Sequence, residues 1–149
     1  METYINNQYI IRIVDDDQAI RESLKSMLEI EGYRVEAWSS PIEFFKADSP
    51  SIPGCLLLDL MMPVMTGIEV QKEMLRRSYD LPIIFISAFG DVESAVRTMK
   101  LGAYDFISKP LNPAKVLECI EQALQKKDLF RQLQESPEII SRRFNELTD

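Results

Sequence analysis

The feature of this sequence that most restricts its fold is a fivefold alternation of short apolar runs with stretches of helical spacing. The apolar runs are predicted strands, at residues 9–14, 33–38, 54–59, 81–87 and 104–108. The third and fourth are almost continuously apolar, as strands covered on both faces should be, so we expect them near the centre of a sheet. The alternation predicts an α/β fold, a doubly wound parallel sheet with helices on both faces.

Each helical stretch has apolar residues at the three and four spacing of one helical face. A last helix is predicted from residue 113 to about residue 133, before the break at Ser136–Pro137. Asp17, Asp91 and Asn112 are predicted N-caps, and Gly32 and Gly102 stand where helices end in left-handed turns. The apolar faces are formed by Ile20, Leu24, Met27 and Leu28, by Ile68 and Leu75, and by Val92, Val96 and Met99.

Composition limits the possible functions. The chain has 17 Lys and Arg against 24 Asp and Glu, a net charge of -7, which argues against nucleic-acid binding by this segment. No apolar run reaches the roughly 18 residues of a membrane helix and no leader is evident, so a cytoplasmic protein is expected. Cys55 and Cys119 lie in apolar stretches without CxxC spacing and are predicted to be reduced core residues. There is no histidine, so any chemistry must use carboxylates, hydroxyls, lysine or an acquired metal.

Polar residues stand at the carboxyl ends of four predicted strands. Asp15 and Asp16 follow the first strand, Asp59 and Ser87 end the third and fourth, and Lys109 follows the fifth. In open parallel sheets ligands bind at this edge, because loops diverge there and helix N-termini supply positive dipoles. These side chains are therefore expected to form one site.

Three crowded carboxylates at one edge would resist ionisation unless a cation were bound, and Mg²⁺ suits oxygen ligands that leave room for phosphate. Lys109 and Ser87 could contact phosphate oxygens, and Asp59 is the best nucleophile because a carboxylate can form an acyl phosphate. Each signal alone has an ordinary structural explanation as a cap, turn or solvated residue, and Asp17 is expected to be only a cap. The joint placement at four strand ends favours a phosphoryl-transfer site.

Four segments carry a family resemblance: IVDDD at 13–17, LLLDLMMPVMTG at 56–67, ISA at 86–88 and SKP at 108–110. Together they resemble the CheY-like receiver domain of two-component response regulators, over about residues 9–125. The resemblance implies the strand order 2-1-3-4-5. It also implies a receiver domain at 1–125, followed at 126–149 by an extended last helix and a linker towards an effector domain that this chain lacks.

The resemblance further implies a role for each site residue. Asp59 would accept a phosphoryl group from a sensor histidine kinase. Asp16 and Asp59 would bind Mg²⁺ with the Met61 backbone carbonyl, and Asp15 would act partly through water. Ser87 would contact the phosphoryl oxygens and move on activation.

Lys109 would pair with the phosphoryl group, and the Lys109–Pro110 peptide is commonly cis in this family. Phe106 stands at the position of the family's rotating aromatic, although it could be a plain core aromatic. Phosphorylation would change the face of the fourth helix, fifth strand and fifth helix. We expect this face to mediate dimerisation, with Val96, Lys100, Tyr104 and Glu118 among its residues.

Residues 88–111 look most like the FixJ-type branch, whose receivers precede a LuxR-type DNA-binding domain, and residues 141–148 resemble the run into such a domain. The intact protein would then regulate transcription; the alternative is a stand-alone receiver or interaction module without DNA-binding output.

The bulk of Met61 and Phe89 beside the site predicts slow autodephosphorylation.

Three other classes are less consistent with the residues. A phosphatase of the haloacid dehalogenase type needs Asp-x-Asp, whereas Met61 stands two positions after Asp59. A flavodoxin-like protein is disfavoured because an acidic first turn would repel a flavin phosphate. A degenerate receiver would have lost a site residue, and none is lost. The chain is thus expected to be a signalling domain that catalyses only its own phosphorylation and dephosphorylation.

Overall fold

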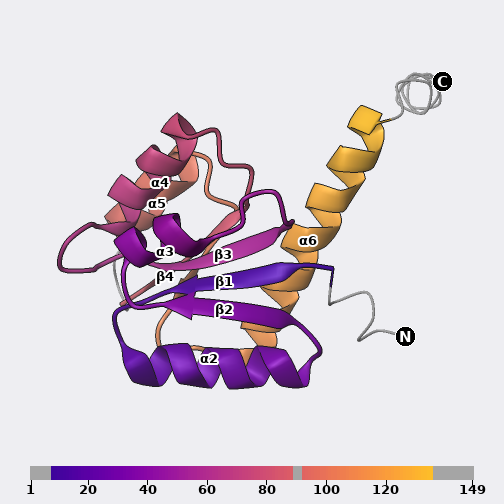
Figure 1. The fold of residues 1–149 in the computed structure, drawn as a ribbon. Helices are drawn as coiled ribbons and strands as arrows, with labels where there is room; N and C mark the ends of the chain where they lie inside the picture. The colour runs from indigo at the N-terminus through magenta and orange to yellow at the C-terminus, as the bar shows by residue number, and fades with distance from the viewer. Residues whose placement is uncertain (1–7, 89–91, 136–149) are drawn as a thin grey trace.

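The structure is a computed structural model, described here for residues 8–88 and 92–135, with side chains up to residue 129. These residues form one five-stranded parallel sheet in the order β2-β1-β3-β4-β5, which confirms the predicted fold (Figure 1). The strands are β1 Ile10–Val14, β2 Arg34–Trp38, β3 Gly54–Asp59, β4 Ile83–Ser87 and β5 Asp105–Ser108. The helices are α2 Gln18–Ile30, α3 Pro41–Ala47, α4 Gly67–Arg76, α5 Val92–Lys100 and α6 Pro113–Glu135.

The helices form two layers around the sheet. Helices α2 and α6 cover one face, and α3, α4 and α5 cover the other (Figure 1). Successive residues of a strand point to opposite faces, so Leu57 of β3 packs with α2 and α6 whereas Leu58 packs with α3 and α4. The central strands β1, β3 and β4 are buried along their whole length, which explains why their sequences are apolar without alternation.

The predicted helix ends agree with the structure where it describes them. The Asp17 carboxylate accepts hydrogen bonds from the backbone N–H groups of Ala19 and Ile20, and the Asn112 side chain caps α6 in the same way. Gly32 and Gly102 adopt φ angles of 93° and 100°, the left-handed conformation that favours glycine. The expected cap at Asp91 and the break at Ser136–Pro137 lie outside the described residues.

The apolar face that the spacing predicts on α5 is turned to solvent. Val92, Val96 and Met99 are exposed, and the one fully buried residue of this helix is Thr98. Leu75 of α4 is likewise exposed, because α4 turns Val70 and Met74 towards the sheet instead. The surface formed by α5 therefore carries an apolar stripe.

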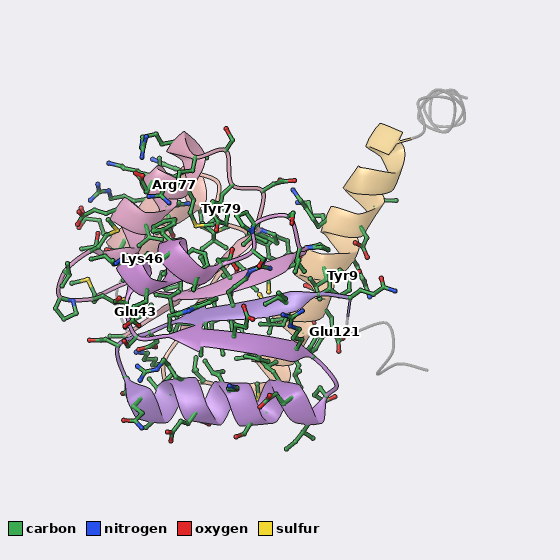
Figure 2. The ribbon with its side chains drawn as sticks, viewed as in Figure 1. Tyr9, Glu43, Lys46, Arg77, Tyr79 and Glu121 are labelled. Atoms are coloured by element: carbon green, nitrogen blue, oxygen red, sulfur yellow. The ribbon has the colours of Figure 1, made fainter. Side chains whose placement is uncertain are left out.

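The short helix α3 occupies the second helical stretch of the predicted alternation, although its seven residues are too few to show helical periodicity. Local capping explains it: the Ser40 side chain accepts a hydrogen bond from the Glu43 backbone, and Pro41 occupies the first turn. Tyr79 and Arg77, labelled in Figure 2, pack over this helix. The Tyr79 ring lies 6.1 Å from that of Phe45, and the Arg77 guanidinium 4.3 Å from the same ring.

A buried ion pair joins β1 to the segment after α3. Arg12 is fully buried in an otherwise apolar strand, and its Nε donates to Asp48 Oδ1 at 2.8 Å. The rest of its guanidinium donates to the carbonyls of Ile10, Ser49 and Ile52. Because every arm of the guanidinium has a partner, the buried charge is compensated.

Candidate functional site

The parallel register brings two strand ends together. Val14, the last residue of β1, pairs with Leu58 of β3, so Asp15 and Asp59 follow at neighbouring positions of the same sheet edge. Asp15 and Asp59 are buried and Asp16 is exposed, and one carboxylate oxygen from each of the three lies within 4.8 Å of the others. This is the acidic cluster that the sequence predicted.

Asp15 is held by the start of α2. Its Oδ1 accepts a hydrogen bond from the Asp17 backbone N–H at 2.9 Å, and its carbonyl accepts one from Arg21 at 2.7 Å. Its Oδ2 is buried and has no hydrogen-bond donor among the described residues. A buried carboxylate oxygen without a donor is costly, so this atom is suited to a cation.

The crowding changes the acidity of both buried carboxyls. Burial, followed by the negative charge of Asp15, raises the pKa of Asp59 from 3.8 to about 7, against the opposing effect of Lys109. Burial likewise raises the pKa of Asp15 above its ordinary value. A bound divalent cation would reverse this effect, because it favours the charged form of its ligands.

Lys109 faces the two buried carboxylates. Its Nζ lies 3.8 Å from Asp15 Oδ2 and 3.9 Å from Asp59 Oδ1, which is ion-pair distance but longer than a hydrogen bond. Its backbone N–H donates to the Ser87 carbonyl at 2.7 Å, which joins the ends of β4 and β5, and the Lys109–Pro110 peptide is cis as the resemblance implied. The ammonium group therefore stands beside the acidic cluster, where its charge can pair with an anionic group.

Ser87 ends β4 next to the end of β3, and its buried hydroxyl donates to the Ala88 carbonyl at 3.0 Å. Phe106 lies in β5 opposite Phe85 and is partly buried against the α3 and α4 side of the core. Both candidate switch residues thus lie on strands at or beside the acidic cluster.

The Met61 backbone N–H donates to Asp59 Oδ1 at 3.3 Å, and the Met61 side chain is 62% exposed in the loop that follows β3. This loop places the Met61 backbone against the Asp59 carboxylate. Phe89, the other bulky residue expected near the site, lies outside the described residues.

Two residues support the site without having been assigned a role from sequence. Arg21 fixes the Asp15 carbonyl, and Gly67 begins α4 so close to β3 that a Cβ there would lie 2.9 Å from the Asp59 carbonyl oxygen. The sequence did carry a signal for Gly67, because a glycine directly after a Thr N-cap allows the start of a helix to lie close to a neighbouring strand. Arg21 could not have been found, since an arginine on a helix is usually solvated.

The donor set fits Mg²⁺. Three carboxylates provide only hard oxygen ligands, which Mg²⁺ prefers, and Asp16 leaves the cluster open to water. The exposed Asp16 also leaves the cluster accessible from solvent to an incoming phosphoryl group.

Comparison with known proteins identifies the family. The family model for the response regulator receiver domain matches residues 11–121. The chain belongs to this family. It is thus a receiver domain of the two-component response-regulator type, as predicted, and the sheet order agrees with that of solved receivers.

Relatives of this receiver domain include named regulators. The chain is 41% identical over 123 residues to the response regulator protein TmoT of Ectopseudomonas mendocina, a match that covers 82% of this chain and 56% of TmoT. It is 40% identical over 116 residues to the transcriptional regulatory protein FixJ of Rhizobium meliloti, covering 77% of this chain and 56% of FixJ. The chain therefore spans about half the length of the curated relatives it matches.

Solved structures agree with the receiver fold. The response regulator StyR superposes with a TM-score of 0.80 at 38% identity, covering 93% of this chain and 70% of the StyR chain. The structure of FixJ-N gives a TM-score of 0.72 at 40% identity, covering 78% of this receiver and 94% of that chain. Over residues 8–88 and 92–135, no helix of the receiver is long and apolar enough to cross a membrane.

Proposed function

We propose that this receiver domain takes a phosphoryl group from a sensor histidine kinase onto Asp59. The observation that carries the proposal is the meeting of three carboxylates within 4.8 Å, with Lys109 Nζ 3.9 Å from Asp59 Oδ1. This arrangement combines a nucleophile, a place for a divalent cation and a fixed positive charge, which are the parts that phosphoryl transfer requires.

In the transfer, a carboxylate oxygen of Asp59 forms a bond to phosphorus as the bond from phosphorus to the kinase histidine nitrogen breaks. The histidine nitrogen keeps the electron pair of that bond, and Asp59 becomes an acyl phosphate. Lys109 stabilises the phosphoryl oxygens by its charge, since it stands beside both buried carboxylates. The protein thus modifies itself and turns over no separate substrate.

Asp15, Asp16 and Asp59, with the Met61 carbonyl, would hold Mg²⁺. The ion would offset the mutual repulsion of the carboxylates and the charge of the incoming phosphoryl group. Asp15 Oδ2 is suited to this role directly or through a water molecule, because it is buried and has no donor among the described residues.

The new phosphoryl group would act on the structure through Ser87. Its hydroxyl donates to the neighbouring Ala88 carbonyl, a local contact that it can exchange for a charged phosphoryl oxygen. Movement of the β4 end would leave space that Phe106 of β5 can occupy. The strand pairing between β4 and β5 supports this coupling.

The surface that would respond is formed by α5, β5 and α6, and we propose that two copies dimerise through it after phosphorylation. The exposed apolar residues of α5 support this, since an uncovered stripe favours association. Val96, Lys100 and Glu118 are exposed on this surface, and Tyr104 is partly exposed.

The phosphoacceptor assignment is tested by intact-mass spectrometry after incubation with acetyl phosphate and Mg²⁺. Wild type and Asp80→Asn, a control on an 81% exposed aspartate, should each gain one phosphoryl group, whereas Asp59→Asn should gain none. A phosphoryl adduct on Asp59→Asn would disprove the assignment.

A Met61→Asn variant should lose the adduct faster than wild type if Met61 hinders the attacking water.

Dimerisation is tested by sedimentation velocity of the phosphorylated protein. Val96→Asp should reduce the dimer fraction, because it places a charge on the apolar stripe. Ile30→Asp is the matched control, since Ile30 is 82% exposed on α2, on the other layer of the molecule. Equal sedimentation before and after phosphorylation would contradict the proposal.

For the intact protein we propose a transcription regulator in the cytoplasm, with a receiver at 1–125 and a helix extension and linker at 126–149 leading to a LuxR-type effector. Its support is the similarity to FixJ, named a transcriptional regulatory protein, and two buried free cysteines. Continuity of α6 across residue 125 would connect the two parts. DNA binding by the full-length protein, but not by this chain, is the expected result in a gel-shift assay.

A further inference from the structure

A second concave site lies between α4, α5 and α6, away from the acidic cluster. This groove has a volume of about 700 Å³, within the range of pockets that hold small molecules. It is formed at the starts of β4 and β5, the sheet edge opposite Asp59, and none of the phosphorylation-site residues line it. Its apolar walls include Met74, Leu75, Leu81, Met99, Ala103 and Leu129.

One side-chain amide of this groove has a hydrogen-bond acceptor without a donor among the described residues. Gln71 of α4 lines the groove and is only 2% exposed. Its Nε2 donates to the Thr98 carbonyl of α5 at 3.0 Å, which fixes the orientation of the amide. Its Oε1 is buried and receives no hydrogen bond from any described residue. Buried acceptors in folded proteins are nearly always paired. We therefore expect this oxygen to accept a hydrogen bond from a bound molecule.

The charged residues at the rim are engaged with their neighbours. Lys127 forms an ion pair with Asp80, and Lys126 lies 5.7 Å from the centre of the Tyr104 ring. A ligand in the groove would therefore meet apolar walls and one neutral acceptor, with Lys127 paired to Asp80 and the exposed Lys126 ammonium beside the Tyr104 ring at the rim. Such a lining favours a neutral ligand over an ionic one.

We propose that this groove binds a neutral ring compound that carries one N–H or O–H donor, which pairs with Gln71 Oε1. The class includes indoles and phenols. The apolar walls would cover the ring, and the single acceptor would orient it. The site is spatially separate from Asp59, because the two lie at opposite edges of the sheet.

The test titrates the ¹⁵N-labelled chain with indole and with 1-methylindole, which lacks the donor, and follows the amide resonances by NMR. Indole should shift the amides of Gln71, Thr98 and Ala103, and should bind about 5-fold more tightly than 1-methylindole, the effect of one hydrogen bond. In Gln71→Met, which keeps the length but removes the acceptor, the two affinities should become equal.

A second variant separates binding from folding. Leu129→Asp should weaken both probes, because it adds a charge to the mouth of the groove from an exposed position. Ile30→Asp, an equal change on α2, should bind as wild type does. These variants keep the proposal testable if Gln71→Met is unfolded by circular dichroism.

Three results would overturn the proposal: neither probe binds at millimolar concentration, both bind wild type equally, or the shifted amides lie outside the groove. Concentration-dependent shifts of the same amides without any probe would show instead that a second copy of the chain covers the groove. That result would also reject the small-molecule site.

Discussion

Replacing Asp59 by Asn should stabilise the metal-free protein at neutral and alkaline pH. In the folded state burial and the charge of Asp15 raise the pKa of Asp59 to about 7, whereas in the unfolded chain it has its ordinary value of 3.8. The folded state therefore binds more protons between these two values, and its stability falls as pH rises through this window. Asn cannot ionise, so the variant avoids this loss.

The magnitude follows from the two pKa values. The difference between 3.8 and about 7 corresponds to roughly 4 kcal/mol of unfolding free energy, which is an upper limit. Asp16 is exposed and Lys109 is partly exposed, so water screens the site, and we expect a difference of about 2 kcal/mol above pH 8. Below pH 4 the difference between the two proteins should vanish.

The assay is urea unfolding in EDTA at pH 4, 6 and 8, followed by the fluorescence of Trp38, the single tryptophan. Trp38 is a suitable reporter because its ring packs 5.3 Å from that of Phe44 in the core and its carbonyl accepts the Asp15 backbone N–H. Asp80→Asn, the same change on an 81% exposed side chain, is the control and should gain no stability above pH 8. The reasoning would be refuted if the difference in unfolding free energy between Asp59→Asn and wild type were the same at every pH.

Three further predictions concern the core. Arg12→Met should lower the unfolding free energy by about 3–5 kcal/mol in urea, because Asp48 would remain as a buried unpaired charge; a loss below about 1 kcal/mol would count against this. Gly67→Ala should destabilise by about 1–3 kcal/mol, since its Cβ would lie 2.7 Å from the Phe85 ring, and unchanged thermal unfolding would argue against that contact. Cys55 should not react with a thiol reagent at pH 8 until the protein is unfolded, because burial raises its pKa to about 12; rapid labelling of the native protein would be inconsistent with that burial.

Sequence reasoning was most successful where one signal had one structural meaning. Uninterrupted apolar runs predicted the central strands. Acidic and basic residues at strand ends predicted that Asp15, Asp16, Asp59 and Lys109 meet, because a parallel sheet brings those ends to one edge. The spacing on α5 left its orientation open, since periodicity reveals an apolar face but not whether that face meets the core or solvent. The Gln71 contact with Thr98 was also out of reach, because it joins two helices whose packing depends on the whole fold.

The long last helix has a mechanical consequence. Its described side chains are buried only as far as Leu124, and the helix then continues to Glu135 past the end of the sheet (Figure 1). A helix of 23 residues is about 34 Å long, so a tilt of about 5° at its base displaces its tip by roughly 3 Å. Small rearrangements beside β5 would thus produce larger displacements of any segment attached to the C-terminal end of α6.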